Sequence, residues 1–275
     1  MDIFNGVVDF LFNILFIPFK NVNPVWGMLV ASFLTGIVML LIFKTTSDQE
    51  GIKKAKNLVK AHFLAIRLYR DDLSLMFGTM KNILLSNLHY MQKSLRPMMF
   101  LILPVGLILI HLGTRYEYRP FKVGETTILS LRLDRKTTLA QLGAIKLELP
   151  EGLSTEIAPV RIEELNEINW RIKAEKPGKY ELVFNLDGKR IKKRLQVVNQ
   201  LVAVTSRISR DSFTTTLMNP GEPSLPGSLP VTAISVAYPK RDFKLLGITM
   251  HWLVAFFVLS LIFGFSFKGI LGVQL

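Results

Sequence analysis

The chain alternates between long apolar runs and segments in which apolar and polar residues are mixed. Its apolar residues concentrate near residues 3–19, 25–43, 98–112 and 245–267. A helix needs about 20 mostly apolar residues to cross the ~30 Å hydrocarbon core of a bilayer, where its backbone groups must be paired within the protein. The pattern predicts an integral membrane protein with about three transmembrane helices, over residues 24–43, 97–113 and 245–267.

The first apolar run differs from the others because polar residues recur in it at helical spacing. Asn5, Asp9 and Asn13 are four residues apart, so they lie on one face of a helix, opposite an apolar face. This spacing predicts an amphipathic helix that lies in the membrane interface over residues 3–19. A signal peptide is the alternative, although the segment starts with Asp2, has no early Lys or Arg and is followed by no small-residue cleavage site.

A basic segment, residues 44–97, separates the first two predicted spans. It holds ten Lys or Arg against four Asp or Glu, a net charge of +6, and its apolar residues repeat at helical spacing in two runs on either side of Tyr69–Asp72. We expect a hairpin of two amphipathic helices, with the second continuing past Pro97 into the second span. Because cytoplasmic loops carry an excess of Lys and Arg, residues 44–97 and the C-terminus are predicted inside and the N-terminus outside.

The pattern changes over residues 114–244, where short stretches alternate apolar and polar residues. These stretches are Thr127–Leu133, Ile145–Leu149, Ile168–Ile172, Tyr180–Leu186, Ile191–Val197 and Thr232–Tyr238. Asp187-Gly188 is a strong hairpin signal, Lys176–Lys179 is a second turn, and the Pro- and Gly-rich stretch 219–230 predicts an irregular loop. The segment therefore predicts an all-β, sandwich-like domain, placed outside the cytoplasm by the span that precedes it.

The predicted organisation has three parts. Residues 1–113 hold the interfacial helix, two transmembrane helices and the cytoplasmic hairpin, residues 114–244 form the extracytoplasmic β domain, and residues 245–275 form the third transmembrane helix with a short cytoplasmic tail. The chain has no cysteine, which excludes disulfides and thiolate metal sites. Its net charge of +13 is shared between the hairpin and the β domain, so we predict no specific nucleic-acid partner.

No catalytic motif is present in the sequence. The four histidines have no partner at metal-ligand spacing, and there is neither a phosphate-cradling Gly-Lys-Ser/Thr loop nor a nucleophile elbow. We therefore predict a protein that is not an enzyme and that has no metal and no cofactor. His111 and His251 fall near the outer ends of the second and third spans; the favoured interpretation places both at the interface within reach of water, and the alternative is a proton shuttle between them.

Ser32 and Thr35 are the polar residues of the first span, and Gly36 follows them. Small residues and hydroxyls in a transmembrane helix commonly serve helix packing. The alternative is a weakly polar groove that accepts the hydrophilic part of a chain entering the membrane. Such a groove needs no catalytic group, because it acts by lowering the cost of burying unpaired polar atoms.

Three stretches of residues 1–113 carry a family resemblance: Phe43–Glu50, where the first span runs into the hairpin, the lysine run Lys53–Lys60, and Tyr69–Asp72 at the hairpin tip. With the order of interfacial helix, span, basic hairpin, span, external segment and span, the chain resembles the YidC/Oxa/Alb membrane insertase superfamily, in particular its minimal three-span, archaeal YidC-like branch. It departs from the bacterial members in having no arginine in the first span, and from the minimal members in its β domain.

The resemblance implies a groove open to the cytoplasm and the lipid, and an insertase-like or chaperone-like factor for membrane protein insertion or assembly in a prokaryotic inner membrane. Ser32 and Thr35 would line the groove. The residues expected to contact a cytoplasmic partner are Lys53, Lys54, Lys56, Lys60, Arg67 and Arg70. The partners would be nascent or newly made membrane proteins, a ribosome and anionic lipid headgroups. The alternative is a non-catalytic subunit of a larger envelope complex that docks through its β domain.

Overall fold

The computed structural model describes residues 2–68, 73–134, 137, 145–186, 188–210 and 221–274, and in parts of three helices it describes the backbone alone. By contacts between residues, the chain divides into two compact units. The β unit comprises Met1–Gly27 and Leu109–Trp252, and the helical unit comprises Met28–Ile108 and Leu253–Leu275. This division cuts through long helices, so it does not test the predicted domain boundaries at residues 113 and 244, which stay predictions.

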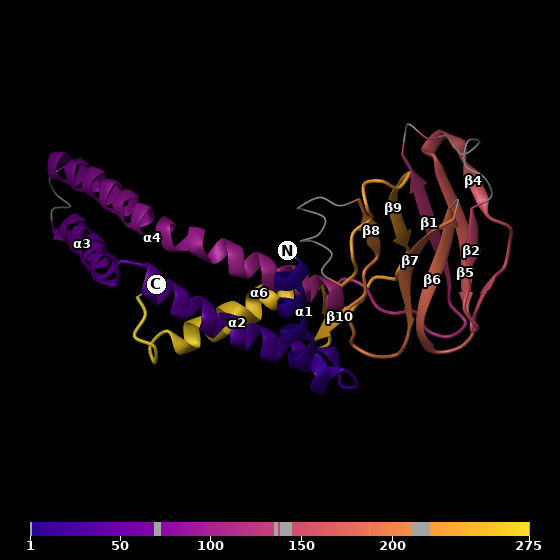
Figure 1. Ribbon diagram of the computed structural model, residues 1–275. Helices are drawn as coiled ribbons and strands as arrows, with labels where there is room; N and C mark the ends of the chain where they lie inside the picture. Colours follow the sequence, from indigo (N-terminus) through magenta and orange to yellow (C-terminus); the bar gives the residue numbers. More distant parts are fainter. Residues whose placement is uncertain are drawn as a thin grey trace. The chain divides into compact units, whose positions relative to one another are not determined.

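The basic segment and the apolar runs are helical, except for the start of the last run (Figure 1). The helices are α1 (Asp2–Phe16), η1 (Ile17–Phe19), α2 (Pro24–Thr46), α3 (Gln49–Leu68), α4 (Leu73–Tyr116) and α6 (Trp252–Phe267). The continuous helix α4 contains Pro97 and Pro104, which confirms that the helix of the second predicted span begins before Pro97. The predicted hairpin tip, residues 69–72, lies outside the described residues.

Among the described residues, two helical segments are long and apolar enough to cross a membrane: α2 and the part of α4 from Pro97 to Tyr116. The prediction for the third span is wrong in its start. Residues 245–250 form a hairpin, in which β10 (Phe243–Leu245) pairs with β11 (Ile248–Met250). Leu246 and Gly247 have φ angles of 50° and 84°, a positive pair that suits a tight hairpin turn. Helix α6 therefore has 16 residues, fewer than the about 20 needed for a full crossing.

The connection between α2 and α3 is a short capped turn. The backbone N–H of Gly51 donates to Asp48 Oδ1 at 2.8 Å, so Asp48 acts as the N-cap of α3. The C-terminal tail lies against the same turn, because the backbone N–H of Gln274 donates to Gln49 Oε1 at 2.6 Å and Lys44 Nζ donates to the carbonyl of Leu271 at 2.8 Å. The stretch Phe43–Glu50, singled out in the sequence, is thus the junction of two helices and the chain terminus.

The β unit contains two larger antiparallel sheets. Their strands are β1 (Thr126–Leu133), β2 (Lys146–Glu148), β3 (Leu153–Thr155), β4 (Val160–Ile162), β5 (Glu167–Ala174), β6 (Gly178–Leu186), β7 (Lys189–Val197), β8 (Arg207–Ser209) and β9 (Val231–Val236). One sheet has the order β3-β5-β1-β9-β8, with β4 also paired to β5, and the other has the order β2-β6-β7. Every predicted strand overlaps an observed one, and Gly188 turns the β6–β7 hairpin with a φ of 83°; Asp187 lies outside the described residues.

The two sheets share one hydrophobic core, to which alternate residues of β1, β5, β6 and β7 contribute. Trp170 of one sheet meets Phe184 of the other edge to face, with ring centroids 5.5 Å apart. Each fully buried Leu, Ile or Phe side chain contributes about 1.5–3 kcal/mol. The core-facing positions of β7 include Lys193, between Ile191 and Leu195. A lysine therefore occupies a position at which the alternation predicts an apolar side chain.

A bidentate ion pair stabilises the segment between α4 and β1, and it gives the first prediction. Arg119 Nη1 and Nη2 donate to the two carboxylate oxygens of Glu125 at 2.9 and 2.8 Å. Chiefly through this hydrogen bond, the pKa of Glu125 lies below its ordinary value of 4.5. The depressed pKa means that the pair stabilises the fold fully above about pH 4.5 and that this contribution is lost as the pH falls through the lowered pKa.

Glu125→Gln is expected to lower the free energy of unfolding by about 1 kcal/mol or less at neutral pH, because both side chains are about 30% exposed. Thermal unfolding of the full-length protein between pH 3 and pH 7 should show a smaller loss of stability with acid in the variant than in the parent. Glu148→Gln, at an exposed position of β2, is the control. An acid-dependence equal to that of the parent would contradict the assigned pair.

Candidate functional site

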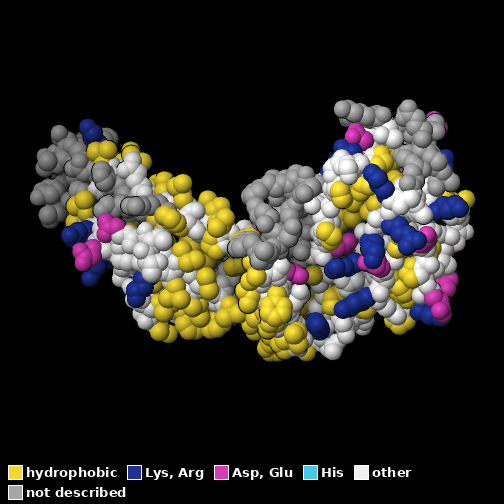
Figure 2. Space-filling view, in the orientation of Figure 1, with side chains coloured by type: hydrophobic (Ala, Val, Ile, Leu, Met, Phe, Trp, Pro, Cys, Tyr) yellow, Lys and Arg dark blue, Asp and Glu magenta, His cyan; other side chains and the backbone are white. Residues whose placement is uncertain are grey.

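The side chains on the surface distinguish the helices from the sheets. In Figure 2, hydrophobic side chains cover much of the helical surface, while Lys, Arg, Asp and Glu gather over the sheets. In the stretch of α4 from residue 98 to residue 103, five apolar side chains are more than half exposed: Met98, Met99, Phe100, Ile102 and Leu103. A contiguous exposed apolar surface of this kind is typical of a helix that meets lipid or another apolar segment.

An apolar cavity of about 280 Å³ lies in the helical unit, between α2, α4 and α6. Its lining residues are Gly36, Met39, Leu40, Phe43, Leu101, Val105, Phe256, Phe257, Ser260, Leu261, Gly264 and Phe265. The hydroxyl of Ser260 is buried and has no hydrogen-bond partner within the described part of the chain. With that one exception the lining side chains are apolar, so the cavity suits an apolar guest and offers almost no polar recognition.

Close packing of α2 against α6 forms one side of this cavity. A Cβ atom added to Gly36 would lie 3.1 Å from the carbonyl oxygen of Ser260 and 3.3 Å from the backbone nitrogen of Gly264. Ser32 and Gly36 on α2, and Ser260 and Gly264 on α6, each form a pair of small residues four apart. Such pairs let two helix backbones approach closely. Gly36, Ser260 and Gly264 also line the cavity, because their side chains are too small to fill the space beside them.

The structure places Ser32 and Thr35 in the interior of the helical unit, 0% and 4% exposed. The Thr35 hydroxyl donates to the carbonyl of Ala31 on its own helix at 2.7 Å, and the Ser32 hydroxyl is buried without a partner. Neither residue lines the apolar cavity. The packing interpretation thus accounts for their position, and contact with a client chain stays a prediction.

The predicted cytoplasmic contact residues lie along α3. Lys53, Lys54 and Lys60 are exposed and Lys56 is half-buried. The side chain of Arg67 and the whole of Arg70 lie outside the described residues. The exposed lysines leave a basic surface on this helix, and the identity of its partner stays a prediction.

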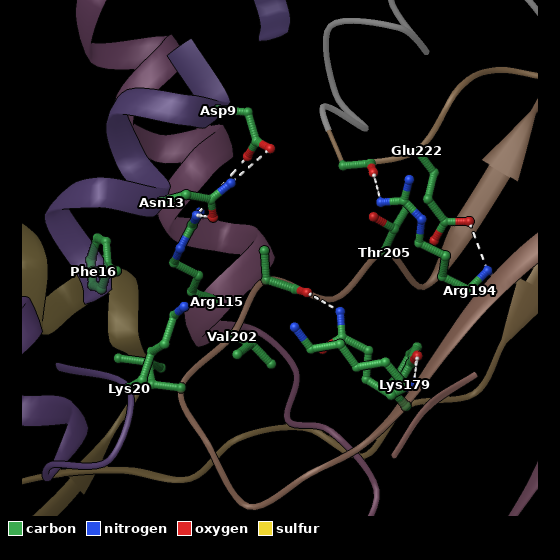
Figure 3. Close-up of a pocket in the computed structure, with 15 residues that line it drawn as sticks. Asp9, Asn13, Phe16, Lys20, Arg115, Lys179, Arg194, Val202, Thr205 and Glu222 are labelled. Atoms are coloured by element: carbon green, nitrogen blue, oxygen red, sulfur yellow. Dashed lines mark hydrogen bonds and ion pairs between the residues drawn. The ribbon is translucent and has the colours of Figure 1, made fainter. Parts of the chain in front are cut away.

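The polar face of α1 binds the last turn of α4 through a buried arginine, Arg115, which is 1% exposed (Figure 3). Its Nη2 donates to Asn13 Oδ1 at 2.6 Å, and its Nη1 donates to the carbonyl of His111 at 3.0 Å. Asn13 in turn donates to Asp9 Oδ2 at 3.0 Å, and the guanidinium lies over the Phe16 ring at 5.2 Å. The polar residues of α1 therefore hold this helix to the protein.

The prediction that both histidines lie within reach of water fails for one of them. His111 is 2% exposed and stacks on the Phe12 ring at 4.6 Å, so the prediction is wrong for it, because the packing of α1 covers the end of α4. The side chain of His251 is 55% exposed. The histidines contact different carboxylates, since His111 Nδ1 lies 3.8 Å from Asp9 and His251 Nε2 lies 3.4 Å from Glu117.

A polar pocket of about 330 Å³ adjoins this cluster in the β unit. Figure 3 shows side chains of α1, α4 and the β6–β7 hairpin around it; the charged ones are Asp9, Lys20, Arg115, Lys179, Arg194 and Glu222. Asp9 offsets the charge of Arg115. Glu222, bound to Lys193 behind the pocket, is likewise neutralised. The remaining charges are Lys20, Lys179 and Arg194, so the pocket is electropositive.

Two groups at the pocket are strongly desolvated: Lys193, which is outside the lining, and Tyr238, which belongs to it. Burial lowers the pKa of Lys193, which Glu222 partly counteracts. Burial raises the pKa of Tyr238, whose hydroxyl accepts a hydrogen bond from the backbone N–H of Gln196 at 3.1 Å. Within the described part of the chain, no three His, Asp or Glu side chains lie close enough together to hold a metal ion.

No protein-family model and no curated protein matches this sequence.

Proposed function

We propose that the chain is an integral membrane protein that acts as a non-enzymatic, insertase-like or chaperone-like factor in the insertion or assembly of other membrane proteins. The observation that carries this proposal is the apolar cavity between α2, α4 and α6, in the unit that contains α2, a helix long and apolar enough to cross a membrane. The resemblance of residues 1–113 to the YidC/Oxa/Alb superfamily supports it.

A cavity of this kind favours an apolar segment by packing. Within a bilayer the surroundings are already apolar, so association of helices depends on van der Waals contact rather than on removal of water. Side chains that line the cavity, such as Phe43 and Leu101, have no contact partner within the protein on the cavity side, so an apolar guest adds dispersion contacts to them. A client helix that inserts side chains there restores these contacts and leaves again without a chemical step.

The basic helix α3 supplies a second part of the proposal. With residues 44–97 in the cytoplasm and the β unit outside, the exposed Lys53, Lys54 and Lys60 would meet anionic lipid headgroups, acidic residues of a newly made chain or a ribosome. A newly made chain would then be captured first at α3, and its apolar segment would afterwards enter the cavity of the same helical unit. The inner membrane of a prokaryote is the proposed location.

In-cell photo-crosslinking tests the proposal with two neighbouring positions of α2. Met39 lines the cavity, whereas Val38 is exposed and does not line it. A photoreactive residue at Met39 should give a ladder of many protein products, because successive clients occupy the cavity. The same residue at Val38 should give few, since the two positions share a depth in the membrane but not the cavity. Equal ladders at both positions would contradict a client site in the cavity.

A second candidate function is a fixed subunit of a larger envelope complex. A pocket of about 550 Å³ on β1, β4 and β5 favours it. Its rim includes Ile128, Ile157 and Val160, each about half exposed, and apolar side chains gathered at a polar surface commonly mark a protein contact. One discrete crosslinked product from a photoreactive residue at Ile128, together with no ladder at Met39, would establish this function in place of the first.

A further inference from the structure

A second polar pocket in the β unit, of about 310 Å³, lies beside the connection between η1 and α2. Its lining contains the basic residues Lys20, Arg119, Lys122 and Arg241, and none of its lining residues is acidic. Lys20 also lines the electropositive pocket of Figure 3. The two pockets therefore adjoin each other, with Lys20 and Leu201 in both linings.

The burial of the charged Arg241 side chain in this pocket is not explained by a contribution to fold stability. Its Nε and Nη2 atoms are buried and have no hydrogen-bond partner among the residues that the structure describes, while its backbone N–H donates to the carbonyl of Glu117 at 3.0 Å. The charged or titratable groups that act on it are Tyr116 and Arg119, and burial lowers its pKa. Leaving two guanidinium nitrogens buried without a partner is costly, so the partly buried side chain of Arg241 is suited to an anion that binds in the pocket.

The other charged residues that line the pocket are also cations, so they do not neutralise the charge of Arg241. Arg119 is engaged by Glu125 through both terminal nitrogens. Neither Lys20 nor Lys122 forms an ion pair with a carboxylate among the described residues. Two lysines thus add to the positive charge of the buried guanidinium. Arginine binds phosphate oxygens through two parallel hydrogen bonds, and lysine adds a mobile point charge. The combination favours a phosphate group over a neutral polar ligand.

The surroundings of the pocket indicate where that phosphate comes from. Pro24, the first residue of α2, lines the pocket. The exposed apolar side chains of Val22 and Trp26 flank it on either side of Pro24, and exposed tryptophan at the end of a membrane-length helix is typical of the lipid interface. We propose that this pocket binds the phosphate of an anionic phospholipid headgroup at the outer end of α2. The inference rests on α2 crossing the membrane but not on client binding.

The test uses the purified full-length protein in neutral detergent, with short-chain phosphatidylglycerol as the anionic probe and short-chain phosphatidylcholine, whose zwitterionic headgroup has no net charge, as the control. Phosphatidylglycerol should raise the unfolding temperature of the parent and phosphatidylcholine should not. Arg241→Gln should weaken phosphatidylglycerol binding by about tenfold or more, since it removes charge-assisted hydrogen bonds. Arg161→Gln, at an exposed position of β4 outside the pocket, should bind like the parent.

Further measurements distinguish a lipid site from a structural role of Arg241 and from a site for free phosphate. Arg241→Gln should unfold at or above the temperature of the parent when no lipid is added, because it removes an unpaired buried charge; a clear loss of stability without lipid would assign Arg241 a structural role and overturn the proposal. Lys20→Gln should also weaken binding. Equal stabilisation by inorganic phosphate alone would mean a free-phosphate site, and unchanged phosphatidylglycerol binding in both variants would refute the pocket. Crosslinking at Met39 is independent of either result.

Discussion

Lys193→Met is expected to lower the free energy of unfolding of the β unit by about 3 kcal/mol or more. Lys193 is 0% exposed and its Nζ lies 2.6 Å from both Glu222 Oε1 and the carbonyl of Thr205. Methionine fills much the same volume but leaves the Glu222 carboxylate, 6% exposed, without its counter-ion. It also leaves a buried carbonyl without its donor. Breaking one side of a buried pair costs more than the pair contributes, because the remaining charge stays desolvated.

Thermal unfolding of the full-length protein in detergent measures this effect, with hydrogen exchange of β7 as a local readout. The matched control is Lys192→Met on the same strand, whose side chain is exposed and pairs with Glu181 at the surface; it should cost less than about 1 kcal/mol. The double variant Lys193→Met/Glu222→Leu should recover part of the loss, since no charge is then left unpaired. A single variant as stable as the Lys192→Met control would show that the pair is not buried.

Gly36→Leu is expected to destabilise the helical unit by about 1–3 kcal/mol, the usual cost of overpacking. The added side chain would meet backbone atoms, the Ser260 carbonyl at 3.1 Å and the Gly264 nitrogen at 3.3 Å, and backbone atoms of a helix cannot turn aside as a flexible side-chain end can. The helices α2 and α6 must therefore separate. Since their contact forms one wall of the apolar cavity, the variant should also lose the crosslinking ladder at Met39.

Gly106→Leu is the matched control for this substitution, because nothing lies within 4 Å of a Cβ atom added to Gly106 in the apolar part of α4. Both variants exchange glycine for a good helix former in an apolar helix. The midpoint of thermal unfolding in detergent should fall for Gly36→Leu and stay the same or rise for Gly106→Leu. Equal midpoints for the two variants would contradict the close packing of α2 against α6.

The periodic parts of the fold could be predicted because their cause is local. The alternation in β6 and β7 and the Gly188 turn are visible within one short stretch of sequence. The prediction for the third apolar run was wrong because apolar composition alone does not distinguish a helix from a β-hairpin. Residues 245–250 are as apolar as the helix that follows, and the turn at Leu246 depends on a non-glycine residue with positive φ, which is rare enough to have no sequence signal.

The candidate sites could be predicted less well, because each is formed by residues that lie far apart in the sequence. Ser32 and Thr35 were candidates for a groove because they are polar. The cavity is lined instead by Gly36, which leaves space because glycine has no side chain. The spacing of Asp9 and Asn13 was a usable signal for a partner, but nothing local identified that partner as Arg115, which follows the apolar part of α4. The inward place of Lys193 could be read from the alternation of β7, whereas Glu222 lies 29 residues away in a loop.

Crosslinking from Met39 before and after translation arrest tests the proposed function most directly. The proposal predicts a ladder of many products that fades within minutes once translation stops, because newly made chains no longer reach the cavity. It also predicts that the ladder is absent from Val38. A single discrete product at Met39 that survives translation arrest would contradict the proposal and would mean that the cavity holds a permanent partner.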